Sequence, residues 1–128
     1  MKIAFFELEG WEKQILKEHF SEDELYLSTE KLDEKTIQPV KDFEVICLFV
    51  NSRMTRALME TCPNLRLIAT HSTGYDHIDL TTAREKEISV VFVPGYGNNT
   101  VAEFAFGLIL NLTRKIYTAI DQVKEKEL

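Results

Sequence analysis

Short, predominantly apolar runs constrain the fold of this 128-residue chain more than any other feature. A strand buried on one face alternates apolar and polar side chains, whereas a strand covered by helices on both faces is apolar almost throughout. The pattern predicts a flavodoxin-like, doubly wound α/β domain over residues 1–99, with five parallel strands in the order 2-1-3-4-5. The predicted strands are residues 3–6, 25–27, 45–50, 65–70 and 88–93.

Helical patterns separate these runs. Residues 11–20 place apolar side chains at helical spacing. Thr55 is expected to cap a helix that ends before Pro63. Asp79 is expected to cap another helix over residues 80–86. The alternation of strands and helices supports a parallel sheet with helices on both faces.

A long helix is predicted for residues 100–128. Thr100 and Glu103 form a capping-box pattern directly before the apolar residues 101–112. These apolar residues cover more than one stripe, and a helix that is apolar all round is normally buried all round. Five strands cannot cover every face of it, so we expect an interface or linker helix that meets a second domain or a second copy in a homo-oligomer.

Composition excludes several classes of partner. The net charge of -6 and the pI near 5.1 argue against nucleic acid, which needs clustered Lys and Arg. The apolar residues 101–112 are too few to span a bilayer, and residues 1–6 are too short for a signal peptide. Cys47 and Cys62 belong to no metal-binding pattern, so no metal site is expected. We therefore expect a cytoplasmic protein.

The candidate ligand site lies at the carboxyl ends of the strands, where open parallel sheets bind ligands. Gly74 lacks a β-carbon, so the backbone N–H groups of Thr73 and Gly74 can approach a carboxylate closely. The loops over residues 51–54 and 94–99 reach the same edge. An alternative interpretation is that Ser72-Thr73-Gly74 is only a turn between a strand and a helix.

Gly95-Tyr96-Gly97 has the context of the dinucleotide fingerprint G-x-G-x-x-G, since it follows a strand and precedes a helix. The third glycine position holds Thr100, which is too bulky for close helix–strand packing. A loop that directs Tyr96 toward the cleft is the favoured interpretation.

Four segments together resemble the D-isomer-specific 2-hydroxyacid dehydrogenases and are D-lactate dehydrogenase-like. They are Ser-Thr-Gly-Tyr-Asp-His-Ile-Asp (72–79), Ile-Ser-Val (88–90), Val-Pro-x-Tyr (93–96) and Thr-Val-Ala-Glu (100–103). The resemblance implies the substrate domain of an NAD-dependent oxidoreductase that moves hydride between NAD(H) and a 2-oxo or 2-hydroxy acid. It implies substrate contacts from Asn51, Ser72, Thr73, Gly74 and Tyr96, and cofactor contacts from Thr73 and Thr100.

The family's catalytic Arg, acid and His lie beyond the cofactor fingerprint, so no catalytic residue is assigned in this chain. We therefore expect a dehydrogenase truncated before its NAD-binding domain, inactive by itself and binding no cofactor alone. The alternative is a non-catalytic module for small-acid binding or oligomerisation. His77 departs from the family pattern, which usually has Asn there, and Glu87 stands where Gly often ends the helix.

Overall fold

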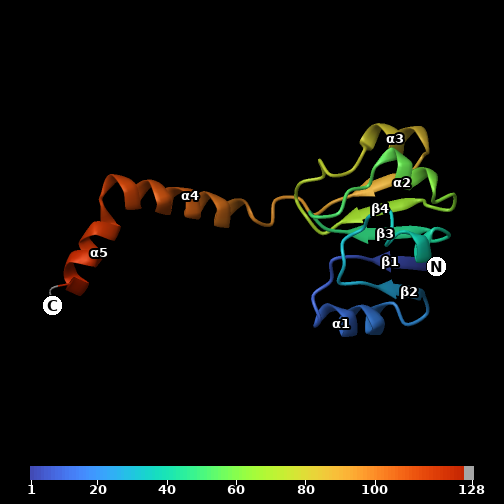
Figure 1. The fold of residues 1–128 in the computed structure, drawn as a ribbon, viewed down its shortest axis with the longest axis horizontal. Coiled ribbons are helices and arrows are strands. Elements are labelled where there is room, and N and C mark those ends of the chain that lie inside the picture. The colour runs from blue at the N-terminus through green and yellow to red at the C-terminus, as the bar shows by residue number, and fades with distance from the viewer. Residues whose placement is uncertain (126–128) are drawn as a thin grey trace. The chain divides into compact units, whose positions relative to one another are not determined.

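Five parallel strands form one sheet in the order β2-β1-β3-β4-β5, which confirms the predicted order (Figure 1). The structure is a computed structural model that describes residues 1–125. Its elements form two units, residues 1–94 and the segment from Gly95 onward, each described by itself. The predicted domain boundary at residues 99 and 100 stays a prediction. The elements are β1 (Lys2–Phe5), α1 (Glu12–His19), β2 (Glu24–Leu27), the 3-10 helix η1 (Gln38–Val40), β3 (Val45–Leu48), α2 (Arg56–Glu60), β4 (Leu67–Thr70), α3 (Leu80–Glu85), β5 (Ser89–Val91), α4 (Asn98–Thr113) and α5 (Ile116–Glu125).

The central strands are buried on both faces, as their composition predicts. All four residues of β3 are buried, and β3 pairs in parallel with β1 on one side and β4 on the other. Ile46 lies opposite both Ala4 and Ile68, so three apolar residues form a row across the middle of the sheet. Because every pair is parallel, the loops that follow the strands meet at one edge of the sheet.

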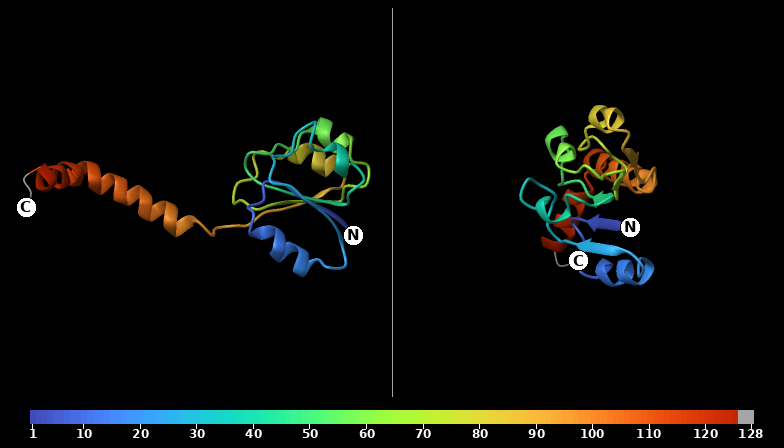
Figure 2. Two further views of the ribbon diagram at one scale, coloured as in Figure 1. Left: turned by 60° about the horizontal axis from the view of Figure 1, so that its bottom comes forward. Right: turned by 90° about the vertical axis from the view of Figure 1, so that its right-hand side faces the viewer.

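Helix α1 covers one face of the sheet, and α2 and α3 cover the other (Figure 2). Leu16 and Phe20, at the end of α1, pack against the smaller core cluster around Ile3 and Phe5. The larger cluster on the opposite face joins strand residues to η1, α2 and α3. Its completely buried members include Phe6, Val40, Ile46, Leu48, Met54, Met59 and Ile68.

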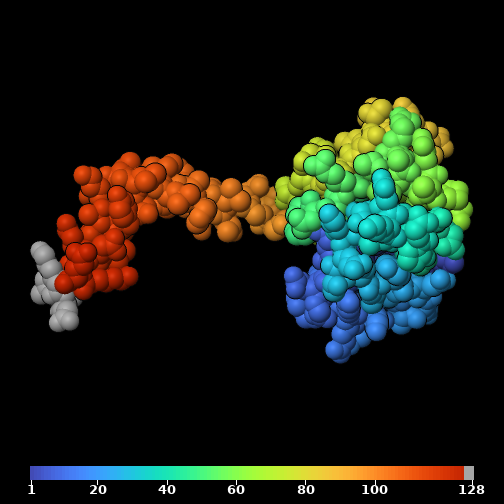
Figure 3. All heavy atoms as spheres, viewed as in Figure 1, coloured from blue at the N-terminus to red at the C-terminus, as the bar shows by residue number. Residues whose placement is uncertain are grey.

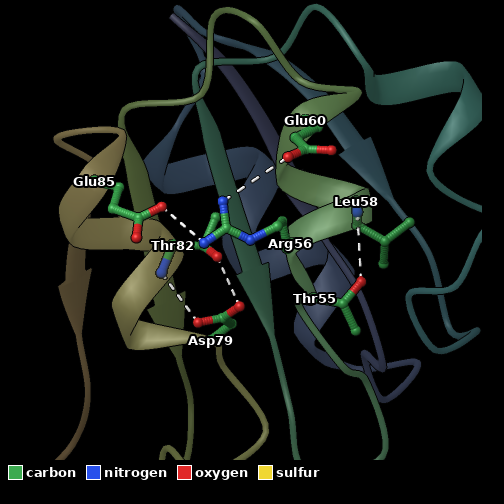
Figure 4. A network of polar contacts seen from close by, with 7 residues as sticks. All are labelled: Thr55, Arg56, Leu58, Glu60, Asp79, Thr82 and Glu85. Carbon is green, nitrogen blue, oxygen red and sulfur yellow. Dashed lines mark hydrogen bonds and ion pairs between the residues drawn. The ribbon is translucent and has the colours of Figure 1, made fainter.

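The predicted caps of α2 and α3 are confirmed. The Thr55 hydroxyl accepts a hydrogen bond from Leu58 N at 3.4 Å, and the Asp79 carboxylate accepts one from Thr82 N at 3.0 Å. Arg56 then links the two capped helices, because its guanidinium contacts Glu85 on α3 at 2.7 Å (Figure 4). These groups are about half exposed, so the ion pair contributes little to stability but orients the helices.

Helix α3 ends in a Schellman motif with a glutamate at the left-handed position. Ile88 N donates to Ala83 O at 2.8 Å, and Glu87 N donates to Arg84 O at 3.2 Å. Glu87 has φ 56°, which confirms the left-handed conformation that glycine would adopt without strain. Burial of Ile88 beside Ala83 in the larger core cluster supports this conformation.

The C-terminal unit contains two helices instead of the single predicted helix. Lys115 has φ 53° and interrupts the helical path between α4 and α5, which run in different directions in the ribbon of Figure 1. The orange and red atoms of this segment show the same bend in Figure 3. The Asn111 side chain accepts a hydrogen bond from Tyr117 N at 3.0 Å, so a side chain replaces a helical carbonyl at this break. The end of the predicted helix, residues 126–128, lies outside the described residues.

The predicted capping box is also wrong. Helix α4 begins at Asn98, after Gly97, and no side chain caps it. Thr100 is therefore the third residue of the helix, where its hydroxyl cannot act as the N-cap acceptor.

Within the described chain, no helix is long and apolar enough to cross a membrane. The cytoplasmic location stays a prediction.

Candidate functional site

The loop that follows β3 is held by a carboxylate from the end of β1. Glu7 Oε1 accepts hydrogen bonds from Phe49 N at 3.3 Å and Ser52 N at 2.8 Å, and it also contacts the Ser52 hydroxyl. Glu7 Oε2 accepts from Asn51 N at 3.1 Å and Asn51 Nδ2 at 2.9 Å. The converging donors form a concave anion site that this chain fills with its own side chain.

The pKa and the backbone conformation of Glu7 both reflect the hydrogen bonds that its carboxylate accepts. Partial burial works to raise the pKa of the Glu7 carboxyl, but the hydrogen bonds from Ser52 and Asn51 outweigh it and lower that pKa. Glu7 also has φ 59°, a left-handed conformation that is unfavourable for a residue with a β-carbon. The hydrogen bonds therefore stabilise a backbone conformation that the residue alone disfavours.

The turn after β4 is supported from within by three side chains. Ser72 and Thr70 are buried, at 4% and 2% exposure. The Ser72 hydroxyl donates to Gly74 O at 2.6 Å and lies 2.6 Å from the Thr70 hydroxyl. His77 Nε2 lies 3.2 Å from the same Thr70 oxygen. The predicted substrate contact Ser72 thus has its hydroxyl engaged below the turn.

The next two residues present unused backbone donors. Thr73 and Gly74 are exposed, and within residues 1–125 neither backbone N–H donates a hydrogen bond. The Thr73 hydroxyl donates to Val93 O at 3.1 Å, and Val93 N donates to Ser72 O at 3.1 Å. A β-carbon on Gly74 would lie 3.2 Å from Asp76 Oδ1. Glycine avoids this close contact with the Asp76 side chain, and the two unbonded N–H groups are available to a small anion.

The loops over residues 51–54 and 71–77 are joined to each other. Met54 N donates to His77 O at 3.0 Å, and Asp79 N donates to Met54 O at 3.0 Å. Beside the turn, the half-exposed rings of Tyr75 and Phe92 lie 5.0 Å apart, centre to centre. The edge of the sheet thus combines open N–H donors with an apolar pair of rings.

The structure brings together only some of the predicted site residues. Asn51, Ser72, Thr73 and Gly74 all lie in loops at the carboxyl edge, but the Asn51 side-chain amide is bound to Glu7. Tyr96 and Thr100 are exposed residues of the other unit, and their predicted contacts stay predictions.

Sequence patterns did not identify Glu7 as a support of these loops, whereas the position of His77 beside the turn suggested packing or a hydrogen bond across it, and His77 Nε2 does contact Thr70. An acidic residue directly after an apolar strand is a visible signal, but its partners lie 42 to 45 residues away.

Neither cysteine contributes a reactive group. Burial raises the pKa of the Cys47 thiol to about 12 and also raises the pKa of Cys62. Both cysteines are free thiols and buried. Among residues 1–125, no cluster of His, Cys, Asp and Glu could hold a metal ion. The chemistry that this edge offers is hydrogen bonding to an anion.

Comparisons with known proteins agree with this geometry. Residues 3–124 match the family described as D-isomer specific 2-hydroxyacid dehydrogenase, catalytic domain. A 2-hydroxyacid dehydrogenase homolog of Zymomonas mobilis subsp. mobilis is 33% identical over 130 residues, which cover 98% of this chain and 39% of the relative. D-lactate dehydrogenase of Escherichia coli is 32% identical, with the same coverage of 98% and 39%.

A solved structure extends the likeness to the fold. The crystal structure of D-lactate dehydrogenase from Aquifex aeolicus, complexed with NAD and lactic acid, has a TM-score of 0.88 and 30% identity. The match covers 98% of this chain and 38% of that one. This chain therefore spans well under half the length of these relatives.

Proposed function

Because this chain belongs to the D-isomer specific 2-hydroxyacid dehydrogenase family, we propose that it forms the substrate-binding part of such an enzyme. The observation that supports this proposal most directly is the pair of open N–H groups of Thr73 and Gly74 at the carboxyl edge of the sheet. Two adjacent N–H groups suit one carboxylate, which 2-oxo and 2-hydroxy acids share. The rings of Tyr75 and Phe92 offer an apolar surface beside it for the rest of a small acid.

The hydride chemistry of the family requires NAD, and the Aquifex aeolicus enzyme was crystallised in complex with NAD and lactic acid. Residues 95–100 do not fit a dinucleotide, since Thr100 replaces the third glycine and α4 is followed by α5 instead of a strand. We therefore propose that any NAD is held by residues beyond this chain. The predicted contacts of Thr73 and Thr100 would be secondary to that binding.

The test measures binding and turnover separately. Pyruvate titrated into the ¹⁵N-labelled chain should shift the amide signals of Thr73 and Gly74 more than those of other residues. Gly74→Ala should weaken the response, because its methyl group would lie 3.2 Å from Asp76 Oδ1 and shift the turn that carries the open N–H groups. Gly10→Ala is the matched control, since a β-carbon there has nothing within 4 Å. Equal binding by both variants would contradict the proposed site.

Turnover is followed as NADH absorbance at 340 nm with pyruvate, glyoxylate and hydroxypyruvate. We expect no oxidation above the protein-free background. Steady oxidation in proportion to the chain would show that residues 1–128 bind the nicotinamide productively, against the proposal.

We also propose that the segment from Gly95 onward is an interface in a homo-oligomer. Helix α4 has no buried residue, and Phe104 and Leu108 are 69% and 49% exposed. Burying each such side chain is worth about 1.5–3 kcal/mol. A helix so apolar is more stable when another protein surface covers it, and a second copy presents the same surface.

Sedimentation measures this assembly directly. The chain, with a mass of 14.8 kDa, should sediment as an oligomer, and Phe104→Lys with Leu108→Lys should dissociate it without unfolding residues 1–94. Ala57→Lys, at an exposed position on α2, is the control for adding one lysine to the surface, and each single variant, Phe104→Lys or Leu108→Lys, is compared with it. A strictly monomeric wild-type chain would remove the proposal.

A further inference from the structure

We infer that His77 is a positioning residue, which fixes the direction of the hydrogen bonds that hold the proposed carboxylate-binding turn open. The inference rests on the proposed function for its biological meaning, but its physical content concerns the turn alone. His77 lies outside the exposed residues of the turn and reaches it through the buried hydroxyls of Thr70 and Ser72.

Each hydroxyl has one hydrogen to donate, and this count sets every direction in the chain of contacts. A carbonyl only accepts, so the Ser72 hydroxyl must donate to Gly74 O at 2.6 Å. Its 2.6 Å contact with Thr70 therefore requires the Thr70 hydroxyl to donate. The Thr70 oxygen can then only accept from His77 Nε2 at 3.2 Å. His77 must carry a hydrogen on Nε2.

This order matters because it controls which way the turn faces. In a trans peptide the C=O of one residue and the N–H of the next point in opposite directions. Holding Gly74 O inward on Ser72 therefore directs the Tyr75 N–H outward. The contact between Val93 N and Ser72 O fixes the Thr73 N–H in the same way. The relay from His77 thus adds Tyr75 as a third outward donor.

Without a donor at position 77, the Thr70 oxygen would accept only the long hydrogen bond from Ser72 N at 3.4 Å, and the order of the relay would be held from the Gly74 end alone. The Thr70 hydroxyl would lose a partner, and Ser72 could turn its hydrogen toward Thr70 instead of Gly74 O. The Gly74–Tyr75 peptide would then be free to rotate, and an anion would meet a less ordered set of donors. Nε2–H donates in both the neutral tautomer with hydrogen on Nε2 and the charged ring, so proton uptake by His77 leaves the relay intact.

The first test reads the tautomer directly from ¹⁵N shifts of the imidazole nitrogens in the full chain. His77 is expected to carry hydrogen on Nε2. His19 serves as the internal control with the opposite tautomer, because its Nδ1 lies 2.9 Å from the carbonyl of Ile15. A neutral His77 with hydrogen only on Nδ1 would overturn the inference.

The second test compares two substitutions of similar length. His77→Gln keeps an N–H donor at the Nε2 position, whereas His77→Met provides none. The Gly74 carbonyl and Tyr75 amide signals should move in the Met variant and return toward wild type in the Gln variant. Losing one neutral hydrogen bond in the relay should weaken pyruvate binding about five- to tenfold. The Gln variant should stay within about twofold, because its relay bond remains.

The outcomes separate this inference from the proposed function. Identical turn signals in the wild-type and Met chains would refute the relay even if pyruvate binds. Expected tautomer and turn signals without any pyruvate binding would support the relay and refute the proposed function.

Discussion

Replacing Glu7 by Gln tests whether one carboxylate organises the loop after β3. The carboxylate accepts hydrogen bonds through both oxygens, from three backbone N–H groups and the side chains of Asn51 and Ser52. A glutamine amide keeps only one acceptor oxygen. At the Oε1 position its NH₂ group would face the N–H groups of Phe49 and Ser52, and at the Oε2 position it would face Asn51 N, so in either orientation at least one backbone N–H loses its acceptor.

The magnitude follows from these contacts. Hydrogen bonds to a charged group contribute about 1.5–3 kcal/mol, and the substitution removes the charge from all of them. Because Glu7 is only partly buried, we expect a net destabilisation of about 2–3 kcal/mol. One kcal/mol shifts the Tm of a domain of this size by roughly 4–8 °C, so the Tm should fall by roughly 8–24 °C at pH 7.

The pH dependence supplies an independent check. The pKa of Glu7 is lowered in the folded chain, so its stabilisation is fully present above the unfolded value of about 4.3. It is lost as the pH falls through the folded pKa. The difference in Tm between wild type and Glu7→Gln should therefore shrink below about pH 4.3.

Thermal unfolding followed by circular dichroism measures both effects. Glu9→Gln is the matched control, because Glu9 is exposed and lies two positions along the same loop. A Glu7→Gln chain that melts within about 2 °C of wild type at pH 7 would refute the reasoning, since that shift is under 1 kcal/mol. A difference that grows in acid would refute it equally.

Three further outcomes are expected. Glu87→Gly should raise the Tm by a few degrees, because removing a left-handed penalty of about 1–2 kcal/mol exceeds the entropy loss of about 0.5–1 kcal/mol for glycine; Glu87→Ala should give no such gain in the same melt. A double-mutant cycle on Arg56 and Glu85 should give a coupling below about 1 kcal/mol that decreases with added salt, and a larger, salt-independent value would contradict the exposed geometry. Iodoacetamide at pH 8 should leave Cys47 unlabelled in the folded chain and label it in urea, since burial raises the thiol pKa to about 12. Mass spectrometry of the peptides measures the labelling, and rapid labelling of Cys47 in the folded chain would contradict this prediction.

The sheet could be predicted from sequence because its signals are local. Burial on both faces requires apolar residues at successive positions of each strand, and β3 shows this at all four. The caps of α2 and α3 were equally readable, because Thr55 and Asp79 bond to N–H groups only three residues ahead.

The C-terminal helices could not be predicted in the same detail. Apolar composition indicated a helix, but it does not encode where the helix starts or breaks. The break depends on Lys115 in a left-handed conformation and on the bond from Tyr117 N to Asn111, which compete with continued helix. Lysine rarely adopts φ above zero, so residue type alone favoured continuation.

The candidate site likewise contains residues that the sequence predicts and residues that it does not. The residues expected to face a ligand, Thr73 and Gly74, form a contiguous motif whose backbone chemistry can be read from glycine placement. Glu7 could not be predicted as a support, because it reaches a loop more than forty positions away. A hydrogen bond from His77 across the turn was suggested by its position, but its partners were not, because it acts through two buried hydroxyls.

Backbone donors and supporting side chains should respond differently to substitution. An open N–H donor belongs to the backbone, so position 73 could carry many different side chains and still present this donor. A supporting group must instead match the hydrogen-bond direction of its partners, as Glu7 matches a set of donors and His77 matches the Thr70 hydroxyl that accepts from it. Substitutions of Glu7 or His77 behind the turn should therefore change ligand binding more than conservative changes of the Thr73 side chain, although Thr73, unlike those two residues, stands beside the proposed ligand.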